Sequence, residues 1–101
     1  AFPGLDTHAA ALAAGVKVAG CTVHFVREAV DDGPIVGQAA VPVLPEDTPE
    51  TLAERVLAAE HELYPHCLGL VASGRARVVG KRVAIDGAGT PPPVLFNPPL
   101  G

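Results

Sequence analysis

An apolar repeat in the middle of the chain constrains the fold more than any other feature. The repeat follows helical spacing and consists of Leu52, Val56, Ala59, Leu63, Cys67 and Leu70. Thr48 can cap the first turn of such a helix, and Pro49 suits its first position. One apolar stripe predicts a helix that packs on a sheet. Pro65 lies inside the run and lacks a backbone N–H, so we expect a kink or a break there.

Two apolar runs ahead of this helix have the composition of β-strands. The first, CTVHFV, alternates and places Cys21, Val23 and Phe25 on one face. The second, PIVGQAAVPVL, contains Pro42, which suits a strand end or a sheet edge. Only about eight residues separate the runs, fewer than the dozen or more that a parallel crossover needs. If these strands pair with each other, they pair antiparallel.

Shorter elements are expected on both sides of this unit. The segment from Asp6 to Gly15 predicts a short helix capped by Asp6 or Thr7. After the long helix, RARVVGKRVAIDG has two alternating runs about Gly80-Lys81 and predicts a hairpin. The proline-rich tail, residues 88–101, cannot form a strand ladder and is expected to lie as an extended arm over the surface.

Composition excludes several classes of protein. A chain of 101 residues has the size of one domain, and its net charge of −4 with seven scattered basic residues argues against nucleic acid. No apolar run approaches the roughly 18 residues of a membrane span. The opening AFPGLDTH lacks the order of a secretory signal, which favours the cytoplasm. Because the chain contains no methionine and opens like the middle of a loop, we expect a fragment.

Few side chains are arranged for chemistry. The four histidines form no HExxH and the two cysteines form no CxxC, so no metal site is expected. The cysteines are expected to be small buried thiols rather than a disulfide. Ser73 is the only serine and ends a helix, which disfavours a serine triad. The remaining candidates are His24, the acidic pair Asp31-Asp32, and Glu60.

The residues alone leave two readings open for each acidic candidate. Asp31-Asp32-Gly33-Pro34 is good turn chemistry, yet one of its carboxylates can also carry a catalytic role. Glu60 falls roughly 60° from the centre of the apolar stripe, whereas His61 is expected on the far side of the helix. Glu60 is therefore either an ordinary border residue or a carboxylate that accepts hydrogen bonds from sugar hydroxyls.

Three stretches together carry a specific resemblance. AFPGLDTHAAAL, GCTVHFVREAVDDGPIVGQAAVPV and TPETLAERVLAAEHELYP resemble the C-terminal half of the phosphoribosylglycinamide formyltransferases, over roughly Ala1 to Val79. Formyltetrahydrofolate hydrolases and methionyl-tRNA formyltransferases share a similar strand-loop-strand. The pairs Glu60-His61 and Tyr64-Pro65 fit the purine enzyme better.

The resemblance implies an α/β fold, the C-terminal part of a Rossmann-like formyltransferase. The expected architecture is a mixed sheet, one long kinked helix and a terminal β-hairpin. Residues 1–101 would then be the C-terminal folate-binding part of a formyltransferase domain, with residues 88–101 as its tail. The implied activity is transfer of a formyl group from 10-formyltetrahydrofolate to the amine of 5-phosphoribosylglycinamide in de novo purine synthesis.

The resemblance also assigns roles to particular residues. Asp31 matches an aspartate that lies beside a catalytic histidine, orders a water and favours the protonated imidazole. His24 matches a strand histidine that supports the site. The implied pterin-binding loop consists of Val26, Arg27, Glu28, Ala29, Val30 and Asp31. The implied nucleotide-binding turn consists of Leu57, Ala58, Ala59 and Glu60, in which Glu60 holds the ribose hydroxyls.

The family's Asn-x-His-Pro motif has no counterpart in these 101 residues. We therefore expect the chain to be inactive by itself, and to need the missing N-terminal half or to self-associate through an exposed sheet edge. Two alternatives remain open. One is formyltetrahydrofolate hydrolysis, with water as the acceptor, and the other is a catalytically silent module that binds folate or another protein.

Overall fold

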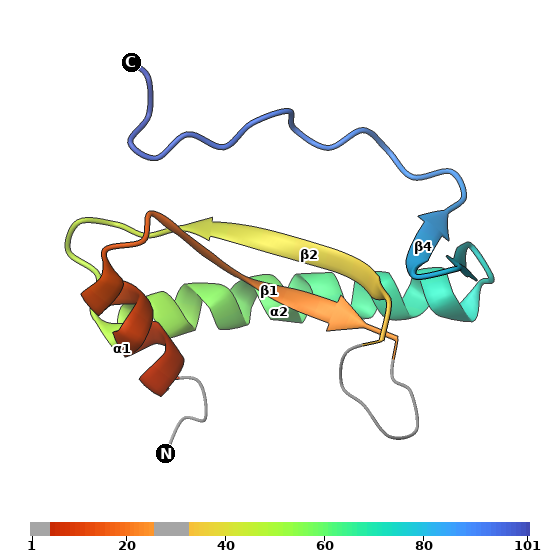
Figure 1. Cartoon of the computed structure of the whole chain (residues 1–101), viewed down its shortest axis with the longest axis horizontal. Coiled ribbons are helices and arrows are strands. Elements are labelled where there is room, and N and C mark those ends of the chain that lie inside the picture. Colours follow the sequence, from red (N-terminus) through yellow and green to blue (C-terminus); the bar gives the residue numbers. More distant parts are fainter. Residues whose placement is uncertain (1–4, 26–32) are drawn as a thin grey trace.

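The computed structural model describes residues 5–25 and 33–101. A long helix lies along a two-stranded hairpin, with a short helix at one end and a small second hairpin at the other (Figure 1). In chain order the elements are α1 (Leu5–Ala14), β1 (Val18–His24), β2 (Ile35–Pro42), α2 (Pro49–Ala72), β3 (Ala76–Val79) and β4 (Arg82–Ile85). Helix α1 starts one residue before Asp6, so Asp6 lies in its first turn and the predicted cap at Asp6 or Thr7 is wrong.

Strands β1 and β2 pair antiparallel, as their short connection predicts. Val18 lies opposite Pro42 and Val23 opposite Gly37, and the register shifts between Val23 and His24. Pro42 is the last residue of β2, where its missing N–H costs no ladder bond. The burial of β1 alternates from Val18 through Val23, because one face packs toward α2.

The predicted mixed sheet is wrong for the described part of the chain. The described strands form two separate antiparallel pairs, β1 with β2 and β3 with β4. Each strand is followed closely by its partner, and such short connections permit only antiparallel pairing. The terminal hairpin is confirmed. Val79 lies opposite Arg82 across Gly80-Lys81, and Gly80 adopts the positive φ of 64° that favours glycine in a tight turn.

Helix α2 begins as its sequence predicts. The Thr48 hydroxyl accepts from the Thr51 N–H at 3.2 Å, and the Thr51 hydroxyl accepts from the Thr48 N–H at 2.9 Å. Pro49 occupies the first turn. The helix continues through Pro65 to Ala72, so the predicted break is wrong. Pro65 removes one N–H donor, while Cys67 and Leu70 beyond it are buried and anchor the last turns.

The core lies between the hairpin and α2. Val41, Leu52 and Val56 form its buried centre, and Leu12 and Ala59 are among the partly buried residues packed on it. Gly37 of β2 lies against α2: a Cβ added there would stand 2.7 Å from the Cys67 Sγ atom and 3.3 Å from Leu63 Cδ1. The two layers approach this closely because glycine has no side chain.

The tail connects distant parts of the chain. Residues 88–101 contain neither helix nor strand, and they run alongside β2 in Figure 1. The Asn97 side-chain amide donates to the Lys17 carbonyl at 2.7 Å and to the Val43 carbonyl at 2.8 Å. Lys17 precedes β1 and Val43 follows β2, so Asn97 joins the tail to the open end of the hairpin.

A charged pair connects α2 to the end of β2. Arg55 binds Asp47 through two hydrogen bonds of 2.6 Å and donates to the Pro42 carbonyl at 2.7 Å. Asp47 also accepts from the Leu44 N–H and the Thr51 hydroxyl, both at 2.8 Å. These donors, Arg55 first, hold the pKa of Asp47 well below its usual range. The Asp47 side chain is 3% exposed, against 32% for Arg55.

Acid should weaken the fold through Asp47. A carboxyl whose pKa is depressed in the folded state adds stability above its unfolded pKa of about 3.9, and this stability is lost as the pH falls toward the folded pKa. Asp47→Asn should therefore lower the free energy of unfolding at pH 7 by about 1–3 kcal/mol and flatten its decline below about pH 4. Solvent screening at the partly exposed Arg55 reduces the contribution of this pair.

Urea unfolding at a series of pH values measures this effect. Asp86→Asn is the matched control, because Asp86 pairs with Arg77 on the surface at 3.0 Å with both side chains more than half exposed. The control variant should unfold almost like the unmodified chain. If the free energy of unfolding of Asp47→Asn and of the unmodified chain declined equally at acid pH, the stabilising role of Asp47 would be contradicted.

Candidate functional site

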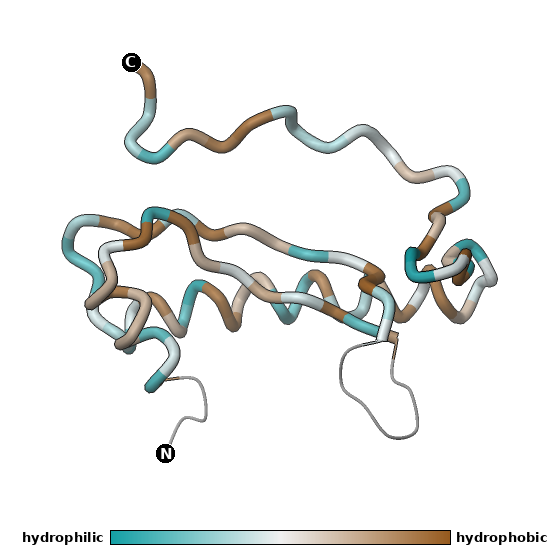
Figure 2. Tube along the Cα trace, viewed as in Figure 1, coloured by the Kyte–Doolittle hydropathy of each residue, from teal (hydrophilic) through white to brown (hydrophobic). Residues whose placement is uncertain are grey.

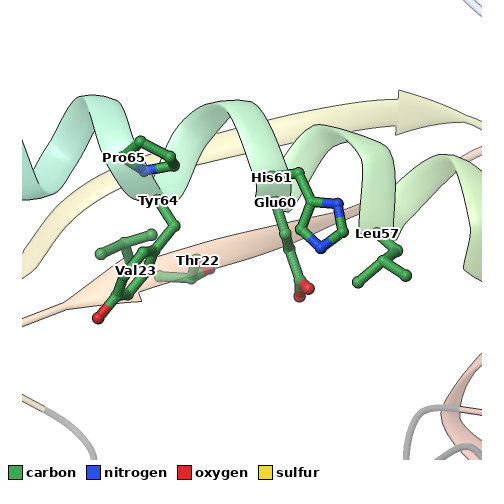
Figure 3. Close-up of a pocket in the computed structure, with 7 residues that line it drawn as sticks. All are labelled: Thr22, Val23, Leu57, Glu60, His61, Tyr64 and Pro65. Carbon is green, nitrogen blue, oxygen red and sulfur yellow. The ribbon is translucent and has the colours of Figure 1, made fainter.

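A pocket of about 440 Å³ opens between the end of β1 and the middle of α2 (Figure 3). Its lining residues are Thr22, Val23, Leu57, Glu60, His61, Tyr64 and Pro65. The helix supplies most of these side chains, and β1 supplies the rest. The lining combines a carboxylate, an imidazole, a phenol and a hydroxyl with apolar groups, a composition typical of small-molecule sites.

The helical spacing of α2 determines which of its residues face the pocket. Leu57, His61 and Tyr64 follow each other at intervals of four and three residues, so they share one side of the helix. Glu60 lies on the flank between this side and the buried stripe. In Figure 3 the Glu60 carboxylate and the Tyr64 ring extend from the helix in the same direction. In the described part of the chain, the hairpin covers the neighbouring stripe of α2 and leaves this side to line the pocket.

The structure corrects the predicted position of His61, which was expected on the far side of the helix. His61 lines the same pocket as Glu60. Consecutive helical residues diverge by about 100°, and the pocket mouth is wide enough to include both. The exposed character of His61 was predicted correctly, whereas its separation from Glu60 was not.

The four residues of the expected nucleotide-binding turn divide between two environments. Leu57 and Glu60 line the pocket, Ala59 packs against the core, and Ala58 is exposed outside the lining. Among the described residues the ion pairs are Arg55–Asp47 and Arg77–Asp86, and Glu60 belongs to neither. Its carboxylate is thus available to a ligand.

Glu60 affects the thiol on the neighbouring strand. Burial raises the pKa of Cys21, and the negative charge of Glu60 raises this pKa further. Burial likewise raises the pKa of Cys67, with Cys21 nearby. Both thiols are free, and a raised pKa keeps a thiol protonated and weakly nucleophilic at neutral pH. The pocket therefore offers oxygen and nitrogen groups for binding rather than a thiolate for attack.

His24 lies at the end of β1, beside the pocket residue Val23. Its Nδ1–H donates to the Gly33 carbonyl oxygen at 2.9 Å, and the adjacent Phe25 N–H donates to the Pro34 carbonyl at 2.8 Å. These two bonds join the residues on either side of the segment 26–32. Because Nδ1 carries the proton, the other ring nitrogen of a neutral His24 remains an acceptor.

Part of the expected site lies outside the described residues. This applies to the whole expected pterin-binding loop, Val26, Arg27, Glu28, Ala29, Val30 and Asp31. Among residues 5–25 and 33–101, no group of three or more His, Cys, Asp or Glu side chains gathers as metal ligands do. None of the described helices is long and apolar enough to cross a membrane.

Five lining residues were not predicted from the sequence: Thr22, Val23, His61, Tyr64 and Pro65. A signal for two of them was present. His61 and Tyr64 follow Leu57 at helical spacing, so a stripe drawn through Leu57 rather than Leu52 would have included them. Thr22 and Val23 could not be found this way, because only tertiary packing brings the end of β1 beside α2.

Comparison with known proteins identifies relatives over most of the chain. The family model described as "Formyl transferase" matches residues 1–68. The chain is 57% identical over 77 residues to the trifunctional purine biosynthetic protein adenosine-3 of Gallus gallus, and this match covers 76% of the chain and 8% of that protein. It is 38% identical to the phosphoribosylglycinamide formyltransferase of Escherichia coli (strain K12), with 90% of the chain and 43% of that enzyme covered.

A solved structure has the same fold. The glycinamide ribonucleotide transformylase 1 of Symbiobacterium toebii superposes with a TM-score of 0.73 and 58% identity, over 85% of this chain and 41% of that one. The chain thus spans less than half the length of these relatives. These matches show that the chain is a homologue of the phosphoribosylglycinamide formyltransferase domain. The family match covers residues 1–68, and it does not confirm the expectation of a C-terminal half. Because the family model matches residues 1–68, about two thirds of the sequence, the chain belongs to the formyl transferase family.

Proposed function

We propose that the chain works as part of a phosphoribosylglycinamide formyltransferase. This enzyme transfers a formyl group from 10-formyltetrahydrofolate to the amine of 5-phosphoribosylglycinamide in purine biosynthesis. The observation that carries the proposal is the position of Glu60, which lines a pocket beside the strand end that leads into residues 26–32. The Glu60 carboxylate is suited to a sugar, and the end of β1 leads to the expected folate loop.

The nucleotide is proposed to bind along the turn from Leu57 to Glu60. The Glu60 carboxylate accepts hydrogen bonds from the ribose hydroxyls, and Leu57 forms an apolar wall of the pocket. Ala59 faces the core, so its part is to hold this turn of α2 against the hairpin. Ala58 contributes through the backbone of the same turn.

The folate is proposed to bind along the segment Val26–Asp31, largely through backbone groups. Val23 lines the pocket and precedes this segment by three residues, so the two ligands would meet at the end of β1. His24 supports the segment, because its bond to Gly33 joins the residues on either side. Backbone recognition accommodates side chains as different as Arg27, Glu28 and Ala29.

The reaction is proposed as an acyl transfer. The amine nitrogen of 5-phosphoribosylglycinamide forms a bond to the formyl carbon, the carbon–nitrogen bond to the folate breaks, and the proton lost by the amine reaches the folate nitrogen. Asp31 assists by stabilising the protonated form of a neighbouring histidine, which belongs to the remaining part of the domain. That histidine and an asparagine beside it stabilise the oxyanion of the tetrahedral intermediate.

A protein partner is part of this proposal. Two-stranded hairpins are marginal by themselves, and the ends of the hairpin expose Val18 and Ile35, which are 43% and 44% exposed. Further apolar positions lie along the tail in Figure 2, where Val94, Leu95 and Phe96 are about half exposed. We propose that the remaining part of a formyltransferase domain, or a second copy of the chain, covers these surfaces in the cytoplasm.

Reassembly tests the proposed activity. The 101-residue chain, mixed with a polypeptide that carries the rest of the domain, should form formyl-glycinamide ribonucleotide from 10-formyltetrahydrofolate, and neither part should do so alone. Folate binding without turnover in the mixture would favour a silent binding module. Release of formate without any requirement for the nucleotide would favour a hydrolase.

Glu60→Gln tests the nucleotide side of the site in the reassembled enzyme. Loss of the charge should raise KM for 5-phosphoribosylglycinamide by about 10–100-fold, because hydrogen bonds to a charged group contribute about 1.5–3 kcal/mol. KM for the folate should stay unchanged. Glu62→Gln is the matched control, since Glu62 is exposed on the same helix outside the pocket lining. An equal effect of both substitutions would contradict the assignment.

A further inference from the structure

Tyr64 is the one tyrosine of a chain that contains no tryptophan, and it lies on the wall of the pocket. It follows Glu60 by four residues, which places it about 6 Å further along the same flank of α2. In Figure 3 the ring extends past Val23 on the side to which the Glu60 carboxylate also points. The phenol and the carboxylate thus border the same opening.

The fold itself makes little use of the Tyr64 ring. Tyr64 is 59% exposed, while the core contacts of this part of α2 come from Cys67 and Leu70, which are 1% and 7% exposed. An exposed aromatic ring in a concave site offers a rigid apolar face at a small cost in conformational entropy. Pro65 extends this apolar wall by one residue.

A ribose ring presents two kinds of surface to such a site. Its hydroxyls lie at the edge and suit a carboxylate, whereas its carbon-bound hydrogens form an apolar face that suits an aromatic ring. We infer that Tyr64 is a specificity-determining residue of the nucleotide pocket, whose ring packs against the apolar face of the ribose while Glu60 binds the hydroxyls. This inference rests on the nucleotide site proposed above. It assigns the two surfaces of one sugar to two residues on one turn of helix.

The test measures binding of ribose 5-phosphate to the domain reassembled from this chain, labelled with ¹⁵N, and the polypeptide that carries the rest of the domain, followed by nuclear magnetic resonance. Tyr64→Ala should raise Kd by about fivefold or more, as expected for the loss of an aromatic contact of about 1 kcal/mol. Tyr64→Phe keeps the ring and should stay within about twofold of the unmodified chain. Leu68→Ala is the matched control, because Leu68 is exposed to a similar degree, 55%, outside the pocket lining.

A second ligand separates the roles of the two residues. 2-Deoxyribose 5-phosphate lacks one hydroxyl but keeps the apolar face of the ring. Glu60→Gln should therefore weaken its binding less than it weakens that of ribose 5-phosphate, whereas Tyr64→Ala should weaken both to the same extent. Circular dichroism melting curves verify that the variants keep the fold.

The outcomes distinguish this inference from the proposed function. If Glu60→Gln weakens binding of ribose 5-phosphate and Tyr64→Ala does not, the role of Tyr64 is overturned and the nucleotide site stands. If Tyr64→Phe loses as much affinity as Tyr64→Ala, the hydroxyl rather than the ring face is the contact, which also overturns the inference. If neither Glu60→Gln nor Tyr64→Ala changes Kd, or if the reassembled domain binds no ribose 5-phosphate, the nucleotide site falls and the role of Tyr64 falls with it.

Discussion

Asp31→Asn, in the enzyme reassembled from this chain and the rest of the domain, should lower kcat by about 100-fold or more, the scale of an acid–base contribution. The neutral amide no longer stabilises the positive charge of the neighbouring imidazole. The pKa of that histidine should fall, and because its protonated form is the active one, the alkaline side of the pH–rate profile should move to lower pH. Steady-state kinetics across a series of pH values measure both effects. KM for 5-phosphoribosylglycinamide should change little.

Asp32→Gly is the control for this substitution. Turn chemistry alone treats Asp31 and Asp32 as equivalent, whereas the family resemblance separates them. The resemblance implies a turn position for Asp32 that needs no carboxylate, so its replacement should leave kcat within about threefold of the unmodified enzyme. Equal losses from the two substitutions would show that the loop matters for its conformation and that Asp31 has no separate catalytic role.

Gly37→Ala should lower the stability of the chain by disturbing the packing of the hairpin on α2. The new Cβ would stand 2.7 Å from the Cys67 Sγ atom, closer than real Cβ atoms come to their neighbours. The sulfur cannot simply rotate into solvent, because Cys67 is 1% exposed. Overpacking of this kind costs about 1–3 kcal/mol, which urea unfolding of the chain resolves as a lower midpoint.

A double-mutant cycle shows whether the sulfur is the cause. Cys67→Ala alone removes the sulfur and should also destabilise the chain, because it leaves a small cavity beside Gly37. In the Gly37→Ala, Cys67→Ala double variant the added methyl occupies this space. The double variant should therefore lose less stability than the sum of the losses in the two single variants. Strictly additive losses would mean that Gly37 is required for its backbone conformation rather than for the close approach.

Local patterns were sufficient to predict the elements of secondary structure. The start of α2 depends on Thr48 and Pro49, whose effects act within one turn, and the structure confirms both. The turn at Gly80 and the antiparallel pairing of β1 with β2 follow from short connections in the same way. Each of these features is decided by residues within about a dozen positions of one another.

Features that depend on residues far apart in the sequence could not be predicted from local patterns. A break at Pro65 was one expectation, yet the helix continues to Ala72, and Cys67 and Leu70 beyond the proline are buried. The bonds of Asn97 to Lys17 and Val43 join residues that are 80 and 54 positions apart, beyond the reach of any local pattern. The same holds for the contact of Gly37 with Cys67.

The candidate site likewise combines features set by local sequence with features set by tertiary packing. The sequence by itself determined that Glu60 lies at the border of an apolar stripe, because helical period alone sets the angle between Glu60 and the buried residues. Only the tertiary structure decided that this border opens into a pocket shared with His61 and Tyr64. The reason is physical. In the described part of the chain, the two-stranded hairpin covers one stripe of α2 and leaves its flank open, and strand pairing rather than the helix sets the width of that hairpin.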